Sequence, residues 1–192
     1  MNKITYVLWG LIITTLISAL DANIMQTASP TIVNQLGGKE LFAWIFSVYM
    51  LASTIMVPLF GKLSDIYGRK KLLIIAVALF TLGSVLCGLA NSMVTLIIFR
   101  GIQGLGAGGM IPLSMIILGD LFSIEKRGKI QAIFSSIWAL SSIVGPILGS
   151  FFAEALTWRW IFFINIPIGI ATVLCLIPYK EQAEFKKAYI DY

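Results

Sequence analysis

The stretch RGIQGLGAGGM, residues 100–110, decides the fold, because glycines at this density are typical of two unrelated structures. Gly104, Gly106 and Gly109 match the G-x-G-x-x-G spacing of a dinucleotide-binding turn. That turn requires a preceding strand and an acidic residue about 20 positions further on. Here the glycines lie inside a long apolar segment, and the acids that follow come too early. We therefore interpret the stretch as part of a transmembrane helix rather than a nucleotide site.

The composition supports a membrane protein. Hydrophobic residues make up 58% of the 192-residue chain and charged residues 12%, against about 25% charged in a typical soluble domain. So little polar surface indicates that lipid surrounds most of the chain. The chain has no histidine, and Cys87 and Cys175 each lie within an apolar run. We therefore expect no metal site, no disulfide and no nucleophile–base pair, which disfavours an enzyme.

Six apolar stretches predict six transmembrane helices and an all-α fold. Each approaches the length of about 20 residues that a helix needs to cross a bilayer. They run approximately over 5–28, 42–61, 72–90, 94–118, 130–153 and 160–178. Eleven of the fourteen lysines and arginines then fall in segments on the same side as the N-terminus, so both termini are expected in the cytoplasm. The net charge of +5 is thereby a topology signal, and no nucleic-acid partner is expected.

Arg100 carries a charge several residues inside the fourth apolar stretch. An unpaired arginine at the centre of a bilayer costs about 2.5–3.5 kcal/mol on insertion scales. The predicted partner is Asp21, which lies well inside the first stretch and shares a helix face with Thr14 and Ser18. We expect the two charges to meet in a polar, water-filled cavity. The alternatives are an arginine that snorkels to the outer surface and a purely structural ion pair.

The residues around Arg100 follow helical spacing. Gly104 and Gly108 form a G-x-x-x-G pair, which predicts a tight contact with another helix. Gln103 and Ala107 lie with Arg100 on an adjoining strip of the same helix. We therefore expect Gln103 to belong to the same polar site as Arg100.

The segment GKLSDIYGRKK, residues 61–71, follows the second apolar stretch. Gly61 and Gly68 permit the tight or left-handed backbone that a short connection between antiparallel helices requires. Asp65 is expected either to cap a helix N-terminus or to pair with Arg69. The alternative is a basic cytoplasmic loop that only sets the topology.

The fifth apolar stretch contains SSIVGPILGS, in which Ser141, Gly145 and Gly149 recur every four residues. This stripe of small residues predicts close packing against another helix. Pro146 removes one backbone hydrogen bond and is expected to bend the helix. The bend is interpreted either as a moving joint or as a static feature.

These motifs together resemble the major facilitator superfamily of membrane transporters. GKLSDIYGRKK is similar to the inner-loop signature of that family, IIFRGIQGLGAGGMIPL to its fourth-helix motif, and GPILGSFF to the fifth-helix motif of its antiporters. LDANIMQTASPTIV and WRWIFFINIPIG resemble the 14-helix drug:proton antiporter branch, the EmrB/QacA type. Departures from the pattern at Asn23, Gln26, Ser29 and Ser150 leave the family resemblance intact and concern the substrate contacts.

The resemblance implies an N-terminal six-helix half, built from two inverted three-helix repeats, that exports drugs in exchange for protons by alternating access. It implies a small amphiphilic, cationic substrate, and a proton gradient rather than a cofactor as the energy source. The residues that match the family's motifs are the cavity acid Asp21 and its modulating Arg100, the conformational latch Gly61, Asp65, Gly68 and Arg69, and the antiporter helix residues Gly145, Pro146 and Gly149.

The chain length adds further expectations. A facilitator consists of two such halves, so residues 179–192 are expected to form a cytoplasmic tail or the start of a linker to a missing second half. A second copy of the chain is the other expected way to complete the cavity. The expected location is the plasma membrane. The alternatives are a facilitator for another small solute and a truncated membrane remnant or partner that does not transport.

Overall fold

A computed structural model describes residues 3–179, and these residues form helices and short connections without any strand. In chain order the elements are α1 (Lys3–Leu36), η1 (Lys39–Leu41), α2 (Phe42–Tyr67), α3 (Arg69–Gly88), α4 (Met93–Leu121), α5 (Ile124–Ala155), α6 (Trp160–Phe163) and α7 (Asn165–Leu176). Five helices are long and apolar enough to cross a membrane, and α6 with α7 forms a shorter apolar segment. The chain is therefore an all-α membrane protein. From residue 180 onward, the expected tail or linker lies outside the described residues.

The second helix is longer than its apolar stretch. α2 continues through residues 61–67, so that Gly68 alone connects it to α3. Gly68 has φ 97° and ψ 139°, a backbone conformation that residues with a Cβ atom rarely adopt. Gly61 instead lies within α2, and the expectation that it forms part of the turn is wrong. Charged residues such as Lys62 are compatible with a helix. The backbone hydrogen bonds of α2 therefore continue beyond the apolar stretch.

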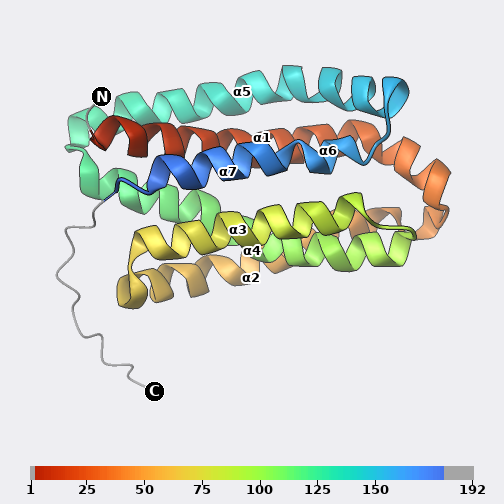
Figure 1. Cartoon of the computed structure of the whole chain (residues 1–192), viewed down its shortest axis with the longest axis horizontal. Helices are drawn as coiled ribbons and strands as arrows, with labels where there is room; N and C mark the ends of the chain where they lie inside the picture. Colours follow the sequence, from red (N-terminus) through yellow and green to blue (C-terminus); the bar gives the residue numbers. More distant parts are fainter. Residues whose placement is uncertain (1–2, 180–192) are drawn as a thin grey trace.

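The sixth apolar stretch is interrupted at Ile164, between α6 and α7. Pro167 lies four residues after Phe163 and lacks the amide hydrogen that would donate to the Phe163 carbonyl. Ile164 nevertheless keeps right-handed helical dihedral angles, φ −59° and ψ −25°. The two segments therefore follow one another along one line (Figure 1), with a local loss of helical hydrogen bonding between them.

α1, α5, α6 and α7 form one group of helices and α2, α3 and α4 form another, and both groups run along the long axis of the molecule (Figure 1). α1 packs against α5 and α7, whereas α4 packs against α2 and α3. The first helix of each half of the chain thus packs against the second and third helices of the other half. This arrangement agrees with two repeated units, α1 to α3 and α4 to α7, that exchange their first helices. α1 and α4 also contact one another and join the two groups.

The glycines of residues 100–110 allow α4 to approach two helices at once. A Cβ atom added at Gly104 would lie 2.5 Å from the Tyr49 carbonyl oxygen of α2, and Gly108 contacts the same helix. A Cβ atom added at Gly106 would lie 2.6 Å from the Ala76 carbonyl oxygen of α3. The predicted tight helix contact is confirmed, and the glycines lie in the middle of a helix rather than in a phosphate-binding turn.

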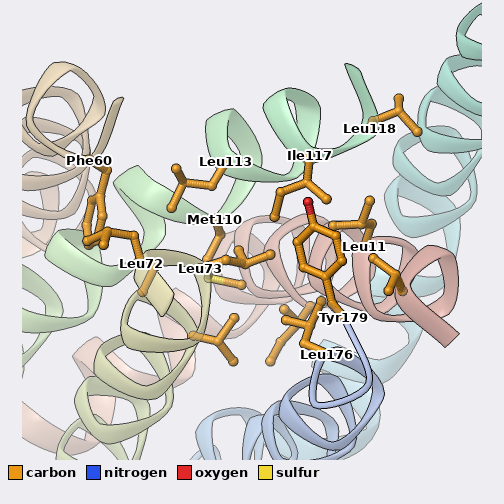
Figure 2. Close-up of a cluster of buried hydrophobic side chains, with 14 of the residues drawn as sticks. Leu11, Phe60, Leu72, Leu73, Met110, Leu113, Ile117, Leu118, Leu176 and Tyr179 are labelled. Carbon is orange, nitrogen blue, oxygen red and sulfur yellow. The ribbon is translucent and has the colours of Figure 1, made fainter. Parts of the chain in front are cut away.

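Two clusters of buried apolar side chains make up the core. The first cluster joins α1, α2, α3, α4, the first part of α5 and the end of α7, and Figure 2 shows part of it, from Leu11 and Phe60 to Leu176. The second cluster joins the opposite ends of α1, α2, α3 and α4 with α6, and includes Ile24, Cys87 and Phe162. Between the two clusters, the helices carry buried polar residues instead of apolar ones.

Candidate functional site

The polar layer between the two apolar clusters consists of Asp21 on α1, Ser84 on α3, Arg100 and Gln103 on α4, and Asn165 on α7. None of these residues is more than 2% exposed. Buried polar groups are stable only when their hydrogen-bonding capacity is met by neighbours. The layer is therefore held together by the partners described below.

Asp21 and Arg100 form the ion pair that the sequence predicts. Arg100 Nη1 donates to Asp21 Oδ2 at 2.9 Å, and each side chain is 1% exposed. This contact contradicts the snorkelling alternative, since the guanidinium is directed into the protein. The pair lies between the two apolar clusters, and protein encloses both side chains. Thr14 and Ser18, on the same face as Asp21, are buried as well.

Gln103 connects the two charged groups. Its Nε2 donates to Asp21 Oδ1 at 2.8 Å, and its Oε1 accepts from Arg100 Nη1 at 2.8 Å. Gly83 of α3 faces the backbone of this residue, since a Cβ atom added there would lie 2.5 Å from the Gln103 nitrogen. Gln103 thus lies in the polar site as expected, and a glycine on the neighbouring helix makes room for its backbone.

Asn165 and Ser84 complete the polar layer and were not among the predicted site residues. Asn165 Nδ2 donates to Asp21 Oδ1 at 3.3 Å and to Ser84 Oγ at 2.9 Å. Ser84 Oγ in turn donates to the Phe162 carbonyl oxygen at 2.9 Å. A signal was present in the sequence, because an amide inside an apolar stretch of membrane-spanning length requires a partner.

Two further side chains contact the polar layer and also escaped prediction. The guanidinium of Arg100 lies 4.0 Å from the ring centroid of Tyr49, in a cation–π arrangement. Cys87 Sγ donates to Gln103 Oε1 at 3.7 Å. Arg100 Nε has no hydrogen-bond partner within residues 3–179. Arg100 is therefore held by a carboxylate, an amide oxygen and an aromatic face.

The arrangement can couple a proton to a structural change. The ionised Asp21 carboxylate accepts hydrogen bonds from Arg100, Gln103 and Asn165. A proton on Asp21 would remove the negative charge that compensates the buried guanidinium, and an uncompensated buried charge is strongly unfavourable. Protonation therefore favours separation of the pair. Among the described residues, no cluster of three or more His, Cys, Asp or Glu side chains could hold a metal ion.

The predicted latch residues lie at one end of the molecule. Arg69 forms ion pairs with Asp65, at 3.7 Å, and with Asp120 at the end of α4. Asp65 therefore pairs with Arg69, and Gly68 precedes α3 without a side-chain cap. The contact with Asp120 was not predicted. It joins the α2–α3 connection to the neighbouring α4–α5 connection, whereas Gly61 faces open space.

The glycine stripe of α5 packs closely against another helix, as predicted, and that helix is α1. A Cβ atom added at Gly145 would lie 2.5 Å from Asn23 Cβ, and one added at Gly149 would lie 3.1 Å from the Ile24 carbonyl oxygen. α5 continues through Pro146 to Ala155 without interruption. The helix that carries Asp21 is thus closely packed against α5.

Comparison with known proteins shows similarity to membrane transporters. The family model of the Major Facilitator Superfamily matches residues 11–188. The chain is 44% identical over 188 residues to "Multidrug resistance protein 3" of Bacillus subtilis (strain 168), covering 97% of this chain and 37% of that protein. It is 45% identical over 173 residues to "Multidrug transporter protein MdtP" of the same organism, covering 90% of this chain and 32% of that protein. The chain thus spans about a third of the length of these curated relatives.

Solved structures show the same fold. The crystal structure of a D-xylose-proton symporter superposes with a TM-score of 0.82 at 18% identity, over 94% of this chain and 49% of that one. A bacterial homologue of the human lysosomal transporter Spinster, in an inward-facing conformation, gives a TM-score of 0.79 at 19% identity, over 98% of this chain and 45% of that one. Both comparisons match the chain to about half of a transporter fold, and the similar proteins are transporters rather than enzymes.

Proposed function

The chain belongs to the major facilitator superfamily, and from this premise we propose that it forms the N-terminal half of a transporter that exports drugs in exchange for protons. The observation that carries the proposal is the buried pair of Asp21 and Arg100, bridged by Gln103 between two apolar clusters. An ion pair at this depth is costly to bury, and ionisable groups within a membrane mark ion and proton pathways. The drug part of the proposal comes from the names of the two Bacillus subtilis relatives, a multidrug resistance protein and a multidrug transporter.

In the proposed mechanism, Asp21 is the proton acceptor. Burial disfavours the ionised carboxylate, whereas the neighbouring Arg100 favours it. Movement of the arginine toward or away from the acid therefore loads or unloads a proton. A cationic, amphiphilic drug that reaches Asp21 would replace the guanidinium as counter-ion, so drug and proton compete for one carboxylate. Competition at a single site is sufficient for exchange, and the proton gradient is the energy source without a cofactor.

The latch and the antiporter helix have separate roles in this proposal. Arg69 holds the α2–α3 connection against the end of α4 through Asp120, and this contact opens or closes as the halves of the transporter rock. Gly68 provides the turn after which Arg69, the first residue of α3, reaches Asp120. Gly145, Pro146 and Gly149 keep α5 against α1, so that a change in α5 reaches the helix carrying Asp21.

The proposal includes the 14-helix EmrB/QacA branch, a plasma-membrane location and cytoplasmic termini. It also requires a partner, either a second half or a second copy of this chain, because about half of a transporter fold matches here. Eleven of the fourteen lysines and arginines on one side of the membrane support the orientation.

The test is Asp21→Asn in the transporter that carries this chain, reconstituted in liposomes. We expect the substitution to abolish drug movement driven by a pH gradient, while Asp21→Glu retains part of it. The assay records a fluorescent cationic drug and the internal pH together. Proton-coupled export that survives Asp21→Asn unchanged would refute the mechanism. If collapsing the gradient has no effect on export by the unsubstituted protein, the solute facilitator replaces the antiporter.

A further inference from the structure

We propose that Asn165 is a positioning residue that orients the Asp21 carboxylate and sets the pH at which this carboxylate takes up a proton. The inference rests on the proposed function only for its consequence in transport. It is argued from the geometry of the polar layer, in which Asn165 is the one residue of α7 with a hydrogen bond to the acid in the part of the chain that the structure describes.

The orientation of the Asn165 amide is determined by its neighbours. The ionised Asp21 carboxylate only accepts hydrogen bonds. Ser84 Oγ uses its own hydrogen to donate to the Phe162 carbonyl oxygen, so it too accepts from Asn165. Both neighbours therefore require a donor, and only the amide nitrogen of Asn165 provides one. The two hydrogens of Nδ2 are used by these two acceptors.

Asn165 lies on a different helix from the other hydrogen-bond donors to Asp21. Arg100 and Gln103 both belong to α4, whereas Asn165 is the first residue of α7. Gln103 and Asn165 share Oδ1, at 2.8 and 3.3 Å, and leave Oδ2 to Arg100 at 2.9 Å. The amide thus keeps the carboxylate turned toward the guanidinium, and it remains a donor when Arg100 moves away.

The support for Asn165 comes from a third helix. Ser84 of α3 receives a hydrogen bond from Asn165 and donates to Phe162, just before the interruption at Ile164. Asn165 is only 2% exposed, so water does not compete for the hydrogens of its amide group. Groups held by such supporting hydrogen bonds keep the geometry that a functional site needs. α3 and the interrupted sixth stretch therefore act together on Asp21.

The charged and titratable groups near Asp21 come from several helices. Arg100 from α4, Tyr49 from α2 and Cys87 from α3 interact with it electrostatically. α7 contributes no acidic or basic residue, and α5 carries its charged residues near its two ends. Asn165 therefore acts as a neutral hydrogen-bond donor, which favours the ionised carboxylate.

The experiment is an infrared titration of the membrane-reconstituted protein without substrate or pH gradient. The carboxyl band of Asp21 is identified by its loss in Asp21→Asn. In Asn165→Leu, which keeps the approximate volume but cannot donate, we expect the midpoint of this band to move to higher pH, because the ionised carboxylate loses one hydrogen-bond donor. The matched control is Thr172→Val. Thr172 is buried on the same helix and bonds only to its own backbone, at the Ile168 carbonyl oxygen, so its midpoint should stay unchanged.

A second variant covers the case in which Asn165→Leu does not fold. Ser84→Ala leaves both Asn165 and Asp21 in place but removes the acceptor that orients the amide, so we expect a smaller shift in the same direction. A midpoint that equals the unsubstituted value in the folded variants overturns the inference, as does an equal shift in Thr172→Val. A shifted midpoint without proton-coupled transport would refute only the proposed function. Coupled transport with an unshifted midpoint would refute only the role of Asn165.

Discussion

The chain contains two arginine–aspartate sites whose chemistry is the same and whose surroundings differ. Arg100 and Asp21 meet at 2.9 Å, each with a side chain 1% exposed. Arg69 pairs with Asp65 and Asp120, and these side chains are 27%, 63% and 40% exposed. The buried pair has lost its water and needs Gln103, Asn165 and Tyr49 to compensate, whereas the exposed site keeps much of its hydration. The same two functional groups therefore form a pair in the core that is costly to break on one side, and a weak, reversible contact at the surface.

Breaking the buried pair should have the largest effect. We expect Arg100→Met to lower the free energy of unfolding by about 3–5 kcal/mol, because Asp21 is left charged and unpaired. Denaturant titration in micelles measures this change. The control is the double variant Asp21→Asn/Arg100→Met, which removes both charges and should recover most of the loss. Equal destabilisation in the single and double variants would show that packing, and not the charge, determines the effect.

The buried site also depends on a close backbone contact that the exposed site lacks. We expect Gly83→Ala to destabilise the protein by about 1–3 kcal/mol, because the new Cβ atom would meet the backbone of Gln103 at 2.5 Å. Gly61→Ala is the matched control, since that helical glycine faces open space, and it should be neutral or stabilising by up to about 1 kcal/mol. The same unfolding titration compares the two, and a neutral Gly83→Ala would contradict the contact.

At the exposed site, Arg69→Gln should change the free energy of unfolding by at most about 1 kcal/mol, since water replaces the lost partners. Its effect should shrink further at high salt, because ions screen exposed charges. The effect of Arg100→Met should depend little on salt. Repeating both titrations at low and high ionic strength checks this contrast, and an Arg69 effect that persists at high salt would argue against it.

The smallest effect is expected for Asp65→Asn. Asp65 and Arg69 are separated by four residues and their charged atoms by 3.7 Å, and such exposed pairs contribute about 0.3–0.5 kcal/mol. Asp120→Asn should cost more than Asp65→Asn, because Asp120 provides the contact between the two connections. The reverse order would indicate that the latch geometry depends on the local pair.

The sequence predicted the buried pair because the membrane leaves few alternatives. A charge inside an apolar stretch needs a partner, and Asp21 was the acid well inside a predicted helix. The spacing of small residues likewise predicted the tight glycine contacts of α4 and α5. Gly61 was expected in a turn, because the apolar stretch ends there and glycine permits tight backbone conformations, whereas α2 continues to Tyr67.

Asn165, Ser84 and Tyr49 were not predicted, because uncharged residues carry a weaker signal than charges. Serine and tyrosine are common in membrane helices and can bond their own backbone or reach the surface. Their roles depend on which helices are neighbours. Ser84 of α3 and Asn165 of α7 are 81 positions apart in the chain, and the packing of α7 against α3 brings them together.

Local polarity, spacing and residue type were enough to predict the fold class, the family, the apolar stretches and the need to pair a buried charge. They did not predict where α2 ends or that the sixth stretch is interrupted. The enclosure of the pair between two apolar clusters, the amide of α7 that supports the acid, and the contact of Arg69 with Asp120 became apparent only from the packed helices. These contacts depend on the relative positions of helices distant in sequence. The physical reason is that periodicity shows which face of a helix is polar, whereas the packing of the other helices determines what that face contacts.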